Sequence, residues 1–136
     1  MARILVIDDQ NDVRAVMTMV LQVNGFDVVE AATAAAGLKA FAEHRVDVVI
    51  VDMLLEDAMG FDVIVKLRER VPDLPVVAVS GLASLSVDMQ MARLPNVVCL
   101  AKPFRPGELI RAVGAAGGMT GVAPAADADL GSRATI

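Results

Sequence analysis

The sequence predicts an α/β fold, with a parallel sheet covered by helices on both faces. Five short apolar runs, most of them rich in Val, Ile and Leu, alternate with segments that carry apolar residues at helical spacing. The runs are nearly continuous rather than alternating, as in strands buried on both faces. Strands that alternate with helices of this length join through right-handed crossovers in one sheet.

Each expected strand ends near a polar or turn-forming residue. The first run, R-I-L-V-I, is followed at once by two aspartates, and the third ends on another aspartate. The second, D-V-V-E, is the weakest because a charged residue stands at each end. The expected strands are residues 3–7, 27–30, 46–51, 75–79 and 97–101.

The helical segments carry their own boundary signals. Gly25 stands just beyond the first helix, where a C-terminal cap is common, and Thr33 can cap the second. Pro72 stops the third helix, and Pro106 favours the first turn of the last. The expected helices are residues 11–23, 34–43, 61–71, 84–93 and 106–113, of which 84–93 has the weakest pattern.

The chain of 136 residues is long enough for one domain of typical size. The apolar periodicity fails from Gly114 onward, where the sequence becomes rich in Ala and Gly. We therefore expect residues 1–117 to form the domain and residues 118–136 to form a flexible tail. No second domain, and so no attached DNA-binding or enzymatic module, is expected in this chain.

Composition excludes several classes of function. The 17 acidic and 12 basic residues give a net charge of −5, which disfavours nonspecific binding to nucleic acid. A single cysteine, Cys99, cannot form an internal disulfide, and we expect it to be a small buried side chain. The apolar runs are too short for a membrane span and the N-terminus lacks a signal peptide, so a cytoplasmic location is expected.

Polar side chains gather where the expected strands end, which is the edge where open parallel sheets bind ligands. A single aspartate there is usually a helix cap, but three carboxylates, a hydroxyl and an ammonium together indicate a binding site. Clustered carboxylates favour a hard cation such as Mg²⁺. One aspartate could then accept a phosphoryl group, whose charge the other groups stabilise. The residues are Asp8, Asp9, Asp52, Ser80 and Lys102.

The motifs at these strand ends resemble those of one protein family. They are I-L-V-I-D-D at 4–9, V-I-V-D-M at 49–53 with Gly60 further on, V-A-V-S-G at 77–81 and A-K-P-F at 101–104. In combination they resemble the receiver domains of two-component response regulators, especially the single-domain, chemotaxis-type regulators. The resemblance covers residues 1 to about 116. It implies a flavodoxin-like, doubly wound five-stranded parallel sheet of order 2-1-3-4-5 with five helices.

The resemblance also implies a role for each site residue. Asp52 would be the phosphoacceptor, and Ser80 and Lys102 would bind oxygens of the phosphoryl group. The bond between Lys102 and Pro103 would be cis. The Mg²⁺ ligands would be Asp8, Asp9, Asp52 and the backbone carbonyl of Leu54.

The implied partners follow from the same family. A phosphohistidine on a sensor histidine kinase or a histidine phosphotransfer protein would donate the phosphoryl group. A downstream protein target would bind the face made by residues 84–93, 97–101 and 106–113. The chain would not be an enzyme with a separate substrate, and would only phosphorylate itself and slowly dephosphorylate itself.

Some positions depart from the usual family pattern: Leu55 and Glu56 stand where Met-Pro is common, and Gly81 stands where Ala is usual. Cys99 stands where members usually carry an aromatic residue that reports phosphorylation to the surface. The resemblance also implies that the side chains of Leu54 and Leu82 flank the path of water toward the phosphorylated aspartate, and neither can orient a water molecule. We therefore predict slow hydrolysis of the phosphorylated form.

Three other functions remain open on the sequence. A Mg²⁺-dependent phosphatase of the haloacid-dehalogenase type also uses an aspartate nucleophile, but needs a second aspartate where Leu54 stands. A flavin-binding protein of this fold needs a phosphate-binding loop after the first strand, where two aspartates stand instead. A receiver-like docking module would not need the five site residues.

Overall fold

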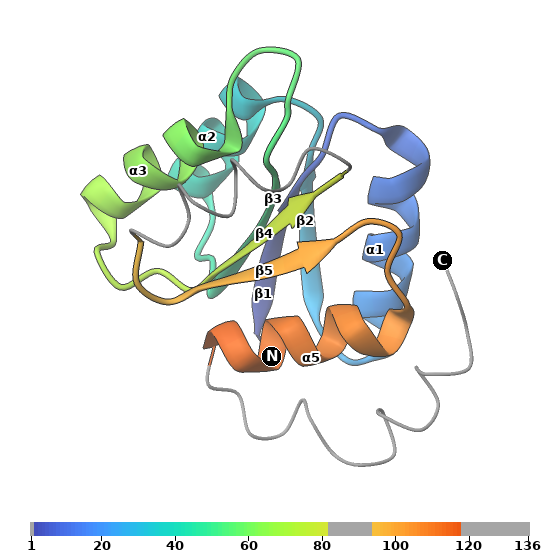
Figure 1. The fold of residues 1–136 in the computed structure, drawn as a ribbon. Helices are drawn as coiled ribbons and strands as arrows, with labels where there is room; N and C mark the ends of the chain where they lie inside the picture. Colours follow the sequence, from blue (N-terminus) through green and yellow to red (C-terminus); the bar gives the residue numbers. More distant parts are fainter. Residues whose placement is uncertain (1, 82–93, 118–136) are drawn as a thin grey trace.

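The computed structural model describes residues 2–81 and 94–117. Its five strands are all parallel and form one sheet in the order β2-β1-β3-β4-β5 (Figure 1). This confirms the predicted fold class and strand order. The strands are β1 (Arg3–Ile7), β2 (Asp27–Ala31), β3 (Val48–Asp52), β4 (Val76–Ser80) and β5 (Val97–Ala101).

Four helices lie in the described residues, two on each face of the sheet (Figure 1). α1 and α5 cover one face, and α2 and α3 cover the other. The expected helix 84–93 and the expected tail 118–136 lie outside the described residues. The helices are α1 (Asn11–Val23), α2 (Ala34–Glu43), α3 (Gly60–Arg70) and α5 (Pro106–Gly117).

Most boundary signals act as predicted. The Thr33 hydroxyl oxygen accepts a hydrogen bond of 3.0 Å from the N–H of Ala36, and Gly25 follows α1 with φ of +89°. The predicted end of the last helix at residue 113 is wrong, because α5 continues to Gly117. Gly114 is buried within the helix and Ala116 packs against the core, so packing outweighs the low helix propensity of glycine.

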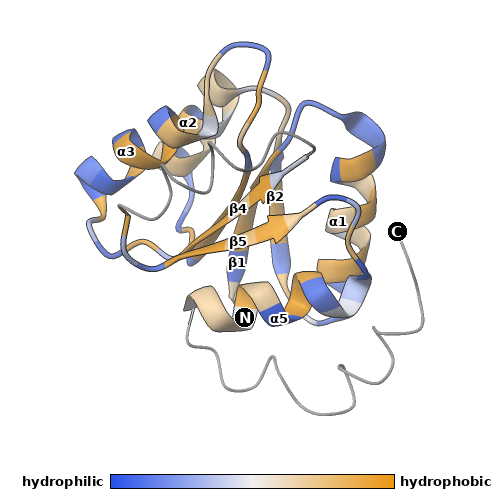
Figure 2. Ribbon diagram, viewed as in Figure 1, coloured by the Kyte–Doolittle hydropathy of each residue, from blue (hydrophilic) through white to orange (hydrophobic). Residues whose placement is uncertain are grey.

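The two faces of the sheet have separate apolar cores. Successive residues of a strand point to opposite faces: Ile4 and Val6 belong to the core under α1 and α5, whereas Leu5 and Ile7 belong to the core under α2 and α3. Figure 2 shows β4 and β5 as hydrophobic along most of their length. Burial on both faces explains why the apolar runs of β1, β3 and β4 are continuous.

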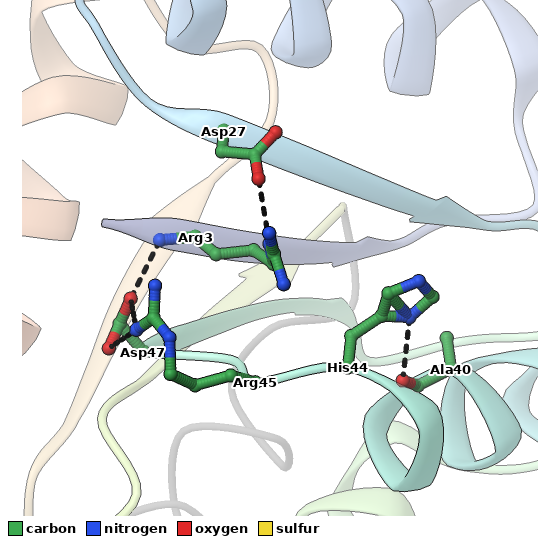
Figure 3. Close-up of polar contacts among 6 residues, drawn as sticks. All are labelled: Arg3, Asp27, Ala40, His44, Arg45 and Asp47. Carbon is green, nitrogen blue, oxygen red and sulfur yellow. Dashed lines mark hydrogen bonds and ion pairs between the residues drawn. The ribbon is translucent and has the colours of Figure 1, made fainter. Parts of the chain in front are cut away.

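An ion pair and a hydrogen bond link the N-terminal end of β1 to β2 and to the residue before β3 (Figure 3). Nε of Arg3 donates to Oδ2 of Asp27 at 2.7 Å, which links β1 to β2. The Arg3 N–H donates to Oδ2 of Asp47 at 2.7 Å, and Nη1 of Arg45 contacts both oxygens of Asp47. His44, the only histidine, also lies at this edge and bonds the Ala40 carbonyl. The polar site predicted from the sequence belongs to the opposite edge.

Three strands differ from the prediction by one or two residues, and β2 ends at Ala31 rather than at residue 30. β3 begins at Val48 rather than residue 46, and its last residue is Asp52 itself. β4 begins after Pro75, which has no N–H for the ladder, and its last residue is Ser80. Both predicted site residues are therefore part of their strands, and the ladder fixes their backbone.

The expectation that Cys99 is buried is wrong, because its side chain is exposed. β5 is the edge strand of the sheet, and Val98 and Leu100 contribute to the core beneath α5. Cys99 lies between them and therefore points to the opposite face. In the part of the chain that the structure describes, no helix is both long and apolar enough to cross a membrane.

Candidate functional site

Three carboxylates meet at the C-terminal edge of the sheet. Ile7 pairs with Val51 in the ladder between β1 and β3, so the residues that follow them, Asp8 and Asp52, are neighbours. Asp9 is the next residue along the chain. One carboxylate oxygen from each of the three aspartates lies within 4.8 Å of the others. The structure thus brings together the acidic residues that the strand-end pattern selected.

Lys102 supplies a positive charge to this cluster from the end of β5. Its Nζ lies 2.9 Å from Oδ2 of Asp52 and 3.2 Å from Oδ2 of Asp8. Its N–H donates to the Ser80 carbonyl at 2.8 Å, which fixes the backbone beside β4. The next bond, to Pro103, is cis as predicted.

The electrostatics of the cluster depend on burial. The Asp8 side chain is fully buried, and this burial raises the pKa of its carboxyl group above the usual value, while the N–H of Gln10 opposes the rise. Burial alone would lower the pKa of Lys102, but its hydrogen bond to Asp52 and the charges of Asp52 and Asp8 outweigh burial and raise it. Lys102 therefore stays protonated beside carboxylates that repel one another.

The residues present fit a small divalent cation. Oδ2 of Asp8 is buried and accepts no hydrogen bond within the described residues, although Lys102 Nζ is close enough for an ion pair. A buried oxygen in this state can serve as a metal ligand, and oxygen donors are those that Mg²⁺ prefers. Asp9 and Asp52 supply two more carboxylate oxygens on the same side.

The loop from β3 to α3 closes tightly over the end of Asp52. The Leu54 N–H donates to Oδ1 of Asp52 at 3.0 Å, and the Gly60 N–H donates to the Met53 carbonyl at 2.9 Å. A Cβ added at Gly60 would lie 2.6 Å from the carbonyl oxygen of Asp52, so only glycine fits there without a shift of the backbone. This close approach of two backbone segments explains why a glycine stands at residue 60.

Asp57 ties the same loop to the start of α2. Its two carboxylate oxygens accept hydrogen bonds from the N–H groups of Ala34 and Ala35, at 2.9 and 3.1 Å. These two bonds lower the pKa of Asp57 below its usual value. The loop that carries Leu54 is thus held to Asp52 of β3 and, through Asp57, to α2, and the second link joins residues more than twenty positions apart.

Replacing Asp57 with alanine is expected to speed amide hydrogen exchange at Ala34 and Ala35, because their N–H groups lose a charged acceptor. The folded-state pKa is lowered, so the contribution of Asp57 to stability is present above its unfolded pKa and is lost as pH falls through the folded pKa. A pH titration of the Ala34 and Ala35 amide shifts checks this. A midpoint no lower than that of an ordinary exposed aspartate contradicts the assignment.

Ser80 is the buried last residue of β4, one position beyond the pair formed by Asp52 and Val79. It therefore lies on the strand adjacent to Asp52. The predicted contact of its hydroxyl with a phosphoryl oxygen stays a prediction. Leu82, expected to flank the site, lies outside the described residues.

Two further residues of the site were not anticipated from the sequence. Oε1 of Gln10 accepts a hydrogen bond of 2.8 Å from Lys102 Nζ, and Glu56 borders the open pocket above the carboxylates. Gln10 directly follows the two aspartates, so its position beyond the first strand could have indicated that it belongs to the site. The pocket has a volume of about 540 Å³ and is lined by Asp9, Gln10, Asp52, Leu54, Glu56, Gly81 and Lys102.

The comparisons with known proteins agree with this geometry. A family model described as the response regulator receiver domain matches residues 4–114. The transcriptional regulatory protein KdpE of Mycobacterium tuberculosis is 35% identical over 116 residues, which are 85% of this chain and 51% of that protein. The chain spans about half the length, or less, of the curated relatives that it matches first.

Solved structures of short chains match over nearly their whole length. A response regulator receiver domain protein from Clostridium thermocellum has a TM-score of 0.80 at 28% identity, covering 87% of this chain and 95% of that one. The chemotaxis protein CheY4 of Vibrio cholerae has a TM-score of 0.76 at 26% identity, covering 82% of this chain and 94% of that one. The match is thus to one whole domain of this type.

Proposed function

The chain belongs to the family of response regulator receiver domains, and we propose on this premise that it is a phosphorylation switch whose phosphoacceptor is Asp52. The observation that carries the proposal is the Asp52 carboxylate, which touches the Lys102 ammonium and lies beside Asp8 and Asp9. This set of charges suits the transfer of a phosphoryl group, whose negative charge is delocalised over its oxygens.

In the proposed reaction, one carboxylate oxygen of Asp52 attacks the phosphorus atom of the donor. A P–O bond to Asp52 forms, and the bond from phosphorus to the leaving group of the donor breaks. Lys102 is placed to hold an oxygen of the transferred group, and the buried Ser80 hydroxyl is the proposed second donor. Neither residue needs to move a proton for the transfer.

Asp8, Asp9, Asp52 and the Leu54 carbonyl would hold Mg²⁺. When bound, the ion would neutralise negative charge at the site during transfer. The pocket above the carboxylates is open to solvent on the side of Leu54 and Glu56. A donor can therefore approach Asp52 from outside without opening of the core.

The proposed partners are those implied by the family. The donor is a phosphohistidine on a sensor histidine kinase or a histidine phosphotransfer protein. The downstream target is a protein that binds the face of residues 84–93, β5 and α5, of which residues 84–93 lie outside the described part. Several of the curated relatives are named as transcriptional regulators, and no direct contact with nucleic acid is proposed for this chain.

The phosphatase alternative is not favoured. Its second aspartate would stand two residues after Asp52, where the chain has Leu54, whose side chain is 54% exposed and has no group to transfer a proton. The match over residues 4–114 is to receiver domains instead. Self-phosphorylation and slow self-dephosphorylation are the only reactions proposed.

The test of the proposed function is the intact mass of the protein after incubation with acetyl phosphate, a small phosphoryl donor. With MgCl₂ the mass should rise by one phosphoryl group, and with EDTA in place of MgCl₂ it should not change. A protein that stays unmodified with MgCl₂ and with a range of small donors contradicts the proposal.

Replacing Asp9 with alanine is expected to weaken Mg²⁺ binding at least about tenfold while the fold persists, because one ligand and one repelling charge are lost together. The measurement is thermal melting with and without MgCl₂, since an ion that binds only the native state raises Tm. Asp12→Ala, an exposed acidic residue of the first turn of α1, is the matched control. Equal responses to Mg²⁺ in Asp9→Ala and wild type would refute the assignment.

Replacing Leu54 with asparagine is expected to speed hydrolysis of the phosphorylated protein roughly tenfold, or about 1.4 kcal/mol of barrier. Leu54 borders the pocket and can exclude water, whereas an amide can orient it. The decay of the phosphorylated mass in buffer with Mg²⁺ measures this rate. Leu82→Glu is expected to act in the same direction, and Val65→Asn on the exposed face of α3 serves as control. Unchanged rates in both site variants would exclude this role.

A further inference from the structure

We infer that Arg14 is a positioning residue for the metal site: it holds the peptide between Asp8 and Asp9 so that the Asp9 carboxylate faces the other two. The inference rests on the proposed function, because it concerns the Mg²⁺ that the acidic cluster would hold. Arg14 contacts none of the three carboxylates through its side chain and acts only through the main chain of Asp8.

Arg14 lies one turn inside α1 and uses all three of its guanidinium nitrogens. Nη1 donates to the Asp8 carbonyl at 2.7 Å, Nη2 to Oδ1 of Asn11 at 2.8 Å, and Nε to Oε1 of Glu30 at 3.1 Å. Its side chain is only 16% exposed. The guanidinium thus links α1, the loop after β1 and the edge strand β2 in one fixed, planar arrangement.

The three carboxylates differ in how they are oriented. Asp8 accepts a hydrogen bond from the Gln10 N–H, and Asp52 accepts bonds from the Leu54 N–H and from Lys102. Within residues 2–81 and 94–117, the Asp9 carboxylate accepts no hydrogen bond. Its direction therefore depends on the backbone that carries it.

That backbone lies beyond the end of β1. The N–H of Asp8 still bonds the Ala31 carbonyl of β2 at 3.1 Å. The carbonyl of Asp8, which belongs to the peptide bond between Asp8 and Asp9, accepts a hydrogen bond from Arg14. Loss of that bond would let the Asp8–Asp9 peptide rotate, and the Asp9 carboxylate would then spend less time near Asp8 and Asp52.

Simple electrostatics predicts the opposite effect for a variant. Removing a positive charge near three carboxylates would by itself strengthen the binding of a cation. A positioning role predicts weaker binding instead. The sign of the change therefore separates the two explanations.

The experiment is titration calorimetry of the full chain with MgCl₂ alone. Arg14→Met should weaken Mg²⁺ binding about tenfold, as is typical when a partner of a metal ligand is lost. Arg14→Lys, which keeps the charge and one donor nitrogen but loses the planar fork, should fall between Arg14→Met and wild type. Arg45→Met is the matched control, since it removes the same charge at the opposite edge of the sheet (Figure 3) and should leave the affinity within about twofold.

Thermal melting in EDTA separates binding from folding. If Arg14→Met does not fold, Arg14→Lys and Glu30→Gln take its place, and weaker Mg²⁺ binding in both supports the inference. A lowered Tm with unchanged or tighter Mg²⁺ binding overturns it, because a merely structural role gives that result. If wild type binds no Mg²⁺, the proposed function and the inference both fail. If wild type is phosphorylated by acetyl phosphate but Arg14→Met binds Mg²⁺ with the same affinity as wild type, only the inference is overturned.

Discussion

Replacing Asp52 with asparagine is expected to abolish phosphorylation by acetyl phosphate. The amide nitrogen and oxygen of asparagine are not nucleophiles at neutral pH, so no P–O bond can form at this position. The asparagine oxygen can still accept the hydrogen bond from the Leu54 N–H, which keeps the loop after β3 in place. The change also removes one of three repelling carboxylates, so the variant should melt no lower than wild type.

Asp62→Asn is the matched control for this variant. Asp62 lies on the exposed first turn of α3, ten residues beyond Asp52, and its replacement changes the net charge by the same amount. It should take up one phosphoryl group as wild type does. If Asp52→Asn still gains the phosphoryl mass, the phosphoacceptor is another residue and the proposed function must be revised.

The fold was predictable because each strand and helix carries local information. The continuous apolar runs correctly indicated strands, of which β1, β3 and β4 are buried on both faces, and Thr33 and Gly25 marked helix ends. The errors lie at boundaries, where packing of distant segments decides the outcome. Gly114 is the clearest case: it is a poor helix former by itself, but it is buried in α5.

The acidic cluster was also predictable, since it depends only on the rule that parallel strands end at one edge. Asp8, Asp52 and Lys102 each follow or end a strand, and the ladder then brings them together. The hydrogen bond between Lys102 and Gln10, by contrast, joins residues 92 positions apart; Gln10 stands at a strand end, but its neutral side chain gave no chemical reason to choose it as a partner of Lys102. Contacts of this kind depend on tertiary structure rather than on any local pattern.

The contacts that support the site from outside the acidic cluster were harder still to predict from the sequence. Asp57 bonds the start of α2 and Arg14 bonds the Asp8 carbonyl, and in both cases one partner is a backbone group. Backbone donors and acceptors are present at every residue, so the sequence does not mark which of them will be used. The backbone group that Asp57 or Arg14 binds can therefore be identified only from the structure.

The exposure of Cys99 shows a third limit. Its place in an apolar run suggested burial, but β5 is an edge strand whose core-facing residues are Val98 and Leu100. Which strand lies at the edge depends on the order of the sheet rather than on the sequence of that strand. The side chain at the family's aromatic position is therefore small and exposed, so any change of surface on phosphorylation cannot come from an aromatic rotamer at residue 99.

Replacing Lys102 with methionine is expected to lower the free energy of unfolding by about 3 kcal/mol at pH 7, because two buried carboxylates lose their charged partner. The loss should shrink on acidification. Burial already raises the folded-state pKa of Asp8, and removal of Lys102 raises it further. Between the unfolded and folded pKa values the native state binds more protons, so stability rises as pH falls.

Mg²⁺ should restore more stability to Lys102→Met than to wild type, because the ion replaces the missing positive charge beside Asp8 and Asp52. Urea unfolding at pH 7 and at pH 5, with and without MgCl₂, measures both effects. Lys66→Met, on the exposed face of α3, is the matched control and should change stability by less than about 0.5 kcal/mol under all four conditions. If Lys102→Met matches this control at pH 7, Lys102 does not neutralise the cluster, and its proposed role in holding a phosphoryl oxygen loses its electrostatic basis.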